Sequence, residues 1–135
     1  MTTNTMLQVK DVLPFQRGDG VITTPLISPN TRPGAAFITG LTSFPVGRAA
    51  PMHSHNSDEQ VTILEGMAEV VMGDRRRVLG PMDTTHIPAN HSHCFNNVGQ
   101  QRPLILWTYA GDHVTRTFSE TGLTVCHLSQ GDKVN

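Results

Sequence analysis

Glycine and proline interrupt this chain at short intervals from one end to the other. Twelve glycines and nine prolines are spread over 135 residues rather than gathered in one tract. Proline fixes φ and lacks a backbone donor, and glycine loosens the backbone, so this spacing disfavours long helices. The stretches between the breaks are rich in β-branched and aromatic residues, and none has a sustained 3.6-residue apolar repeat. The chain is therefore predicted to fold from many short strands.

The predicted strands have the spacing of an antiparallel sandwich or barrel. Gly66 supplies the positive φ for a hairpin turn, and a second turn is expected at Gly73 and Asp74. The arginine run at residues 75–77 is either an anion site or, more often for surface charge, part of a solvated hairpin turn. At most one helical turn is expected, near residues 112–119. The strand predictions are Val21–Ile27, Ala36–Phe44, Gln60–Leu64, Ala68–Met72, Thr84–Ile87 and Leu104–Tyr109.

Length, charge and hydropathy narrow the class of protein. The 135 residues suit one domain, residues 1–135, with an ordered core from about residue 6 to about residue 129. A net charge of −1 leaves no basic excess for nucleic acid, and no apolar run reaches the ~18 residues of a membrane span. The N-terminus lacks a signal peptide's pattern, and two cysteines form no disulfide framework. We therefore expect a cytoplasmic protein with no nucleic-acid or membrane partner.

Five of the seven histidines fall between His53 and His93. His53 and His55, one residue apart, would place both imidazoles on one face of a strand. Glu59 follows the turn-prone residues 56–58, so it can begin the next strand beside them. Two imidazoles and a carboxylate can form a first-row metal site, although this spacing alone is also consistent with a hydrogen-bonded pair of surface histidines.

A second histidine segment follows a predicted tight turn at Pro88 and Asn90. Beyond that turn, His93 and Phe95 would share one face of a strand, and Cys94 would lie on the opposite face. The segment therefore offers one more imidazole that can join the first group.

The two segments resemble the signature motifs of the cupin superfamily. The first motif, G-x5-H-x-H-x3-E-x6-G, is matched at every fixed position from Gly47 to Gly66. The second motif, G-x5-P-x-G-x2-H-x3-N, is matched by Pro88, His93 and Asn97. This chain departs from it at two glycine positions. Asn90 tolerates the left-handed conformation that glycine would adopt, while Met82 predicts a shifted turn in which Gly80 takes that role.

The resemblance implies an all-β fold, the double-stranded β-helix or jelly-roll β-barrel, with one divalent transition metal inside. Carried over position by position, its ligands would be His53, His55, Glu59 and His93. Three imidazoles and a carboxylate leave up to two coordination positions for water or substrate, and suit Fe, Mn, Ni, Co or Zn. Glu59 is also the catalytic candidate, because a carboxylate released from the metal can serve as a general base.

Candidate substrate-binding residues are Phe95, Trp107 and Tyr109, which would give the barrel an apolar wall, although core packing accounts for them equally well. Residues 111–117 follow directly and can fold over the barrel mouth. Within them, Arg116 is either an anion contact or, more often for arginine, an exposed side chain. Among the remaining histidines, His86 is a neighbour of the ligands or an edge residue, and His91 a loop residue. The last one, His127, is expected to be an ordinary polar strand residue.

The resemblance does not name a reaction, because cupins include dioxygenases, isomerases, lyases, cyclases and binding domains. We expect a metal-dependent enzyme acting on a small organic molecule, by dioxygenase-type or redox-neutral isomerase or lyase chemistry. The alternative is a non-catalytic domain that binds or senses a small ligand. A homodimer formed through sheet edges is also expected, with Val21–Ile27 as the pairing strand.

Overall fold

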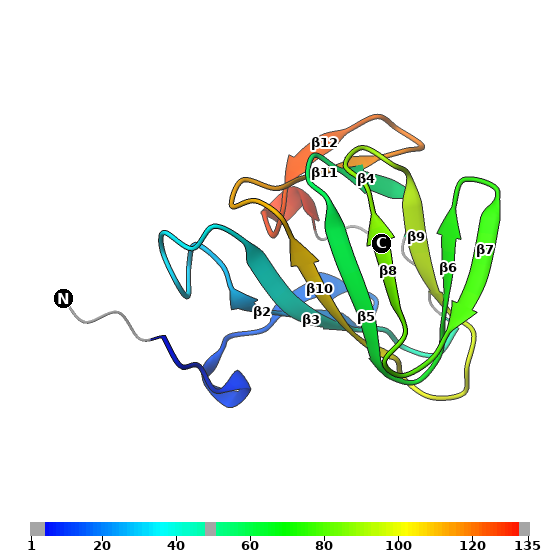
Figure 1. Cartoon of the computed structure of the whole chain (residues 1–135), viewed down its shortest axis with the longest axis horizontal. Coiled ribbons are helices and arrows are strands. Elements are labelled where there is room, and N and C mark those ends of the chain that lie inside the picture. Colours follow the sequence, from blue (N-terminus) through cyan, green and yellow to red (C-terminus); the bar gives the residue numbers. More distant parts are fainter. Residues whose placement is uncertain (1–4, 48–50, 133–135) are drawn as a thin grey trace.

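Two six-stranded antiparallel sheets form the computed structural model, which describes residues 5–47 and 51–132 (Figure 1). The first sheet contains, in spatial order, β1 (Phe15–Gly18), β2 (Val21–Ile27), β3 (Ile38–Ser43), β10 (Leu104–Tyr109), β5 (Glu59–Glu65) and β8 (Thr84–Ile87). The second contains β12 (Thr124–Cys126), β11 (Thr115–Phe118), β4 (His53–His55), β9 (His93–Asn97), β6 (Ala68–Met72) and β7 (Arg75–Leu79). This is the predicted all-β jelly roll.

Helical structure in the described ranges is limited to two 3-10 turns, η1 (Val9–Asp11) and η2 (Gln130–Asp132). Within those ranges, no helix has the length and apolar character to cross a membrane. Residues 48–50, which belong to the spacer of the first motif, lie outside the described residues.

The core lies between the two sheets because alternate side chains of each strand point inward. Along β5, Glu59, Val61 and Ile63 are buried while their neighbours are more exposed. Along β10 the same alternation buries Ile105, Trp107 and Tyr109. The aliphatic side chains and the predicted metal ligand Glu59 therefore share one interior. Glu59 lies at the end of the interior where it pairs with Tyr109 across β5 and β10.

The predicted helical turn near residues 112–119 is wrong, because Thr115–Phe118 form strand β11. Alternating threonines favour a strand, and β11 pairs with β4 on one side and β12 on the other. The arginine run at residues 75–77 is solvated as expected, but it starts strand β7 rather than lying in a turn. The hairpin turn itself lies at Gly73 and Asp74, where Gly73 has a φ of 61°.

The shifted turn predicted from Met82 is also wrong. Met82 itself has a φ of 73°, and the backbone N–H of Asp83 donates to the carbonyl of Gly80 at 3.0 Å. A proline followed by a residue of positive φ makes this a type II turn, with methionine where glycine is favoured. Gly80 has a packing role instead, because a Cβ there would lie 3.0 Å from Sδ of Met67.

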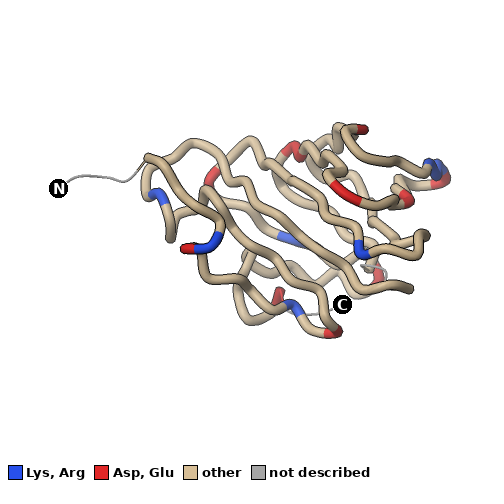
Figure 2. Tube along the Cα trace, turned by 90° about the horizontal axis from the view of Figure 1, so that it is seen from below, with Lys and Arg blue, Asp and Glu red and all other residues tan. Residues whose placement is uncertain are grey.

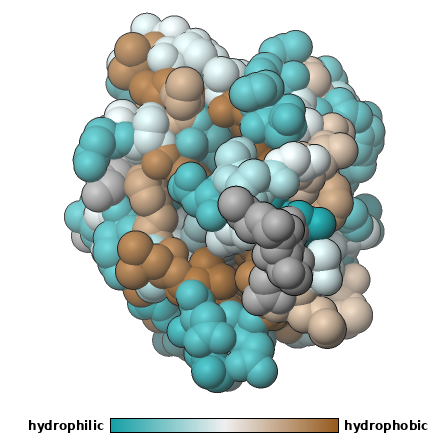
Figure 3. Space-filling view, turned by 90° about the vertical axis from the view of Figure 1, so that its left-hand side faces the viewer, coloured by the Kyte–Doolittle hydropathy of each residue, from teal (hydrophilic) through white to brown (hydrophobic). Residues whose placement is uncertain are grey.

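Val21–Ile27 is not a free edge over its whole length. Strand β1 pairs with residues 21–23, and β3 covers the other side of β2. Basic and acidic residues are interspersed along the trace (Figure 2), and hydrophobic patches lie beside hydrophilic ones on the face in Figure 3. The homodimer and the cytoplasmic location stay predictions.

Candidate metal centre

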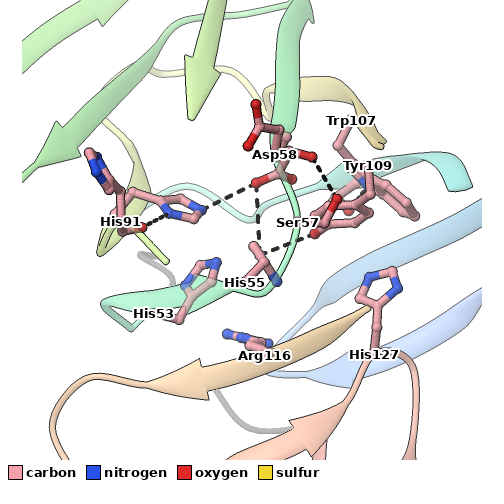
Figure 4. A network of polar contacts seen from close by, with 12 residues as sticks. His53, His55, Ser57, Asp58, His91, Trp107, Tyr109, Arg116 and His127 are labelled. Atoms are coloured by element: carbon pink, nitrogen blue, oxygen red, sulfur yellow. Dashed lines mark hydrogen bonds and ion pairs between the residues drawn. The ribbon is translucent and has the colours of Figure 1, made fainter. Parts of the chain in front are cut away.

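Three imidazoles converge inside the barrel (Figure 4). The alternation of β4 directs His53 and His55 inward, and His93 on β9 pairs directly with His53. Each offers a ring nitrogen, and these three atoms lie within 4.8 Å of one another. The three residues are at most 8% exposed, so the imidazoles are largely shielded from solvent.

The backbone fixes which nitrogen of each ring is free. Nδ1 of His53 lies 2.7 Å from the Pro51 carbonyl oxygen, and Nδ1 of His93 lies 2.9 Å from that of His91. Nδ1 of His55 lies 3.0 Å from the carbonyl oxygen of Thr115. A carbonyl only accepts, so in all three rings Nδ1 carries a hydrogen, and in the neutral form of each ring Nε2 keeps its lone pair. Such carbonyl contacts orient histidine ligands in metal sites.

Glu59 begins β5, and its buried Oε1 has no hydrogen-bond donor. That oxygen lies 3.3 Å from Nε2 of His93 and 3.8 Å from Nε2 of His55. Lone pairs that face one another at these distances repel unless a positive charge lies between them. A divalent transition metal supplies that charge, and nitrogen and carboxylate donors suit it. The donor set therefore fits the metal that the sequence implies.

Burial and neighbouring charges shift the pKa values of these donors toward the protonation states that bind a metal. Burial, followed by the nearby His93 and Arg116, holds the pKa of His53 well below its ordinary value of 6.5. Burial likewise lowers the pKa of His55, although Glu59 opposes the shift. Burial raises the pKa of Glu59, but His93 and His55 outweigh it and leave the pKa below the ordinary 4.5. Neutral His53 and His55 beside an ionised Glu59 are in the protonation states that a metal requires.

A cavity of about 60 Å³ lies against these donors. Phe95, Trp107 and Tyr109, the three residues considered for substrate binding, all contribute to its wall. Trp107 is held by a 2.9 Å hydrogen bond from Nε1 to Oγ1 of Thr42, and only a glycine fits at Gly40, where a Cβ would lie 2.5 Å from the indole. The Tyr109 hydroxyl lies 3.2 Å from Nε2 of His55, so its polar end reaches the donor group.

His127 is not an ordinary polar strand residue. It follows β12, and its ring lies edge-on to Trp107 and Tyr109, with centroid distances of 5.2 and 5.0 Å. Burial, followed by the charge of Arg17, lowers its pKa to about 3. A neutral His127 therefore packs edge-on against the aromatic wall, and its Nε2 lies 3.4 Å from Nη2 of Arg17.

Arg116 is buried, only 4% exposed, and is not the solvated residue that arginine usually is. Its Nη1 lies 2.9 Å from Oδ1 of Asp132, and Nη1 of Arg17 lies 2.9 Å from Oδ2 of the same carboxylate. Asp132 is fully buried, so the ordered core includes this residue, three positions beyond the predicted limit of about residue 129. Sequence reasoning missed Arg17 and Asp132, because no spacing links residues 17, 116 and 132.

The barrel interior thus has two polar regions. We call His53, His55, Glu59 and His93 the histidine side, and Arg17, Arg116, His127 and Asp132 the arginine side. Both guanidinium groups line the same cavity as the histidine side.

The other predicted polar residues lie outside the cavity wall. His86, on edge strand β8, binds Asp58 at 2.9 Å with its side chain 67% exposed. His91 is exposed in the loop before β9, as predicted. Cys94 points away from the donors, with Sγ 3.8 Å from Oδ1 of Asn96. Asn97, the last residue of the second motif, donates to the carbonyl of Pro45 at 3.0 Å.

Comparison with known proteins identifies a matching family profile and a set of solved structures with a similar fold. The sequence profile of the cupin domain matches residues 40–109, just over half of the chain. No curated protein sequence matches it.

Three solved structures illustrate the similarity in fold. The polyketide cyclase RemF from Streptomyces resistomycificus aligns with a TM-score of 0.67 and 21% identity, over 78% of each chain. A sugar phosphate isomerase from Silicibacter pomeroyi aligns at 0.70 and 19%, over 90% of this chain and 86% of that one. The Bacillus subtilis oxalate decarboxylase OxdC aligns at 0.73 and 17%, over 82% of this chain and 31% of its own.

Proposed function

The chain belongs to the cupin domain family, and on that premise we propose that it is a metal-dependent enzyme that moves protons on a small organic molecule. The reaction classes that follow are isomerase, lyase and cyclase chemistry. Glu59 is the proposed base, and His53, His55, Glu59 and His93 are the proposed metal ligands.

One observation carries this proposal. Nε2 of three backbone-anchored imidazoles and the undonated Oε1 of Glu59 face one another beside a cavity, with the Tyr109 hydroxyl 3.2 Å from Nε2 of His55. A hydrogen-bonded histidine cluster with a purely structural role would leave no lone pairs opposed in this way. A bound divalent ion would act as a Lewis acid that polarises a carbonyl or hydroxyl oxygen of the substrate.

Residues of the chain itself would accept the substrate proton and donate a hydrogen bond in the cavity. Glu59 is ionised, and its second oxygen can accept a proton from a substrate carbon or hydroxyl next to the cavity. Burial, followed by the Glu59 charge, raises the pKa of Tyr109 well above its ordinary value of 10, so the phenol stays protonated. Tyr109 therefore stands as a hydrogen-bond donor close to His55. Trp107 and Phe95 would exclude water from the same space.

The similar folds include the isomerase and the cyclase named above, and these reaction classes support redox-neutral chemistry for this chain. Dioxygenase chemistry is the second candidate, because three imidazoles and one carboxylate also suit ferrous iron with open positions.

Metal analysis of anaerobically purified protein is the first test, and we expect about one divalent ion per chain. The loaded protein is then incubated in D₂O with a panel of small hydroxy and keto acids, and mass spectrometry records deuterium uptake. An oxygen electrode follows the same mixtures.

Deuterium exchange without oxygen consumption supports the proposal. Oxygen consumption coupled to substrate loss would replace it with dioxygenase chemistry. Protein that holds no metal, or that binds acids and returns them unchanged, would overturn the enzyme proposal and favour a binding domain.

A further inference from the structure

We propose that Arg116 forms an anion-binding subsite next to the metal centre, so that the substrate is a small carboxylate or an equivalent oxyanion. This inference rests on the proposed function and adds a substrate class to it. Its support comes from the position of Arg116, its unused donor, the charge balance of the cavity and the cavity's size.

The position follows from the register of two neighbouring strands. Arg116 on β11 pairs directly with His55 on β4, so both side chains point to the same face. That face is the barrel interior, and Arg116 lines the cavity together with the histidine side. Figure 4 shows the Arg116 guanidinium next to the rings of His53 and His55, and its charge acts on both rings. A ligand that reaches the proposed metal would therefore lie close to Arg116.

Arg116 keeps a donor that the protein does not use. Its Nη1 is engaged by Oδ1 of Asp132, and its guanidinium carbon lies 4.6 Å from the ring centroid of Phe118. Its Nε is buried and has no hydrogen-bond partner. A buried N–H of a charged group without an acceptor is unfavourable, and a ligand oxygen would satisfy it.

Arg17 provides an internal contrast. Its Nε donates to Oγ1 of Thr23 at 2.8 Å, and its Nη1 donates to the Asp132 carbonyl at 3.0 Å. Its Nη2 lies 3.4 Å from the ring of His127. All three nitrogens of Arg17 therefore have partners in the protein. The subsite is assigned to Arg116, and Arg17 contributes charge and support.

The charge balance of the cavity also favours an anion. Arg17, Arg116 and Glu59 line the cavity, and Asp132 pairs with both guanidinium groups, so with neutral imidazoles these charges cancel. A divalent ion held by the histidine side makes the set positive by two charges. In a buried space of low dielectric constant this excess favours a bound anion over a neutral molecule.

The cavity volume limits the ligand. About 60 Å³ corresponds to roughly four water-sized positions, which suits a short carbon skeleton. Phe95 and Trp107 contribute apolar wall, so the carbon end of such an acid would contact aromatic surface while its carboxylate meets Arg116.

The test uses Trp107, the chain's one tryptophan, as the reporter. Its fluorescence is titrated with acetate and with the neutral isostere acetamide, in metal-free protein and in protein loaded with Mn²⁺. Acetate should bind and acetamide should bind at least about tenfold more weakly in both forms, because a charged hydrogen bond is lost. Arg116→Gln should lower acetate affinity by about tenfold or more, whereas the matched control Arg77→Gln, an exposed arginine of β7, should leave it unchanged.

Asp132→Asn gives a second measurement of acetate affinity, with an outcome that a purely structural role of Arg116 would not predict. It releases the charged partner of Arg116, so acetate affinity should rise several-fold. The inference is overturned if acetate and acetamide bind equally or if Arg116→Gln binds acetate like the parent protein. Where Arg116→Gln does not fold, an acetate affinity of Asp132→Asn no higher than the parent's overturns it. The titration of metal-free protein depends neither on a metal nor on turnover. It therefore tests the anion subsite even if the proposed enzymatic function is wrong.

Discussion

The histidine side and the arginine side share one cavity, but the chain builds them in different ways. On the histidine side, two of the three imidazoles are anchored by a carbonyl two residues earlier in the chain, Pro51 for His53 and His91 for His93. On the arginine side, one carboxylate near the C-terminus binds an arginine of β1 and an arginine of β11. One region is therefore organised mainly by local geometry, and the other only by the completed fold.

This difference has a consequence for energetics. Removal of the His53 or His93 ring loses a hydrogen bond to a carbonyl only two residues away in the chain. Removal of the Asp132 carboxylate leaves two buried guanidinium groups without their counter-charge. We therefore expect changes on the histidine side to affect the metal first, and changes on the arginine side to affect stability first.

The largest expected effect is on metal content. His93→Ala removes one of the four proposed donors, so bound metal should fall from about one ion per chain to nearly none while circular dichroism stays that of the parent. Metal analysis after gel filtration measures this. His91→Ala is the matched control, because its exposed ring is lost while the carbonyl that anchors His93 remains. Full metal content in His93→Ala would show that the ligand assignment is wrong.

The next effect is on stability. Asp132→Ala should lower the free energy of unfolding of the metal-free protein by about 3–5 kcal/mol, because it breaks a buried ionic cluster and leaves two charges unpaired. Urea unfolding measures this. Asp11→Ala, which breaks an exposed pair with Lys10, should change the same quantity by less than about 1 kcal/mol. Similar losses in the two variants would contradict the contrast between the two sides.

The third effect is a pH dependence on the arginine side. His127 has a pKa of about 3 in the folded protein against an ordinary 6.5, so between these values the unfolded chain takes up a proton that the folded chain refuses. Stability of the metal-free protein should therefore fall as the pH drops from about 6.5, by up to ~1.4 kcal/mol per unit from this residue.

His127→Gln isolates that contribution, because it keeps an acceptor for Arg17 and cannot titrate. Unfolding measured between pH 7 and 5 should show a shallower slope in the variant, with about 2 kcal/mol less loss over the interval. His53 and His55, whose pKa values are also lowered, retain part of the slope in both proteins. Asp132 adds nothing in this range, since its pKa lies below 3.8. Parallel slopes would mean that His127 is not held neutral by burial.

The strand pattern predicted an antiparallel sandwich or barrel, and the motif resemblance predicted the jelly roll and the convergence of the histidine side. Alternation within β4 and the turn before Glu59 are local, and the motif spacing restricts which strands carry the donors. The arginine side could not be found in this way. Arg17 and Asp132 are brought together by the pairing of β1 with β2 and the return of η2 to the barrel. Arg116 was misjudged because an isolated arginine is usually solvated, and only the register between β11 and β4 places it inside.

The smallest expected effect is on stability, and it tests whether strain in the turn at Met82 affects the metal site. Met82 is 78% exposed and has a φ of 73°, a conformation unfavourable for any residue with a Cβ. Met82→Gly should relieve this strain, and the greater entropy of glycine in the unfolded chain offsets part of the gain. A net increase of about 0.5 kcal/mol in the free energy of unfolding is expected, with unchanged metal content. Asn90→Gly, at a φ of 69°, is the control and should change stability by only a few tenths of a kcal/mol, because Asn already tolerates this region. A loss of stability or of metal in Met82→Gly would show that this turn is coupled to the histidine side through β8 and β5.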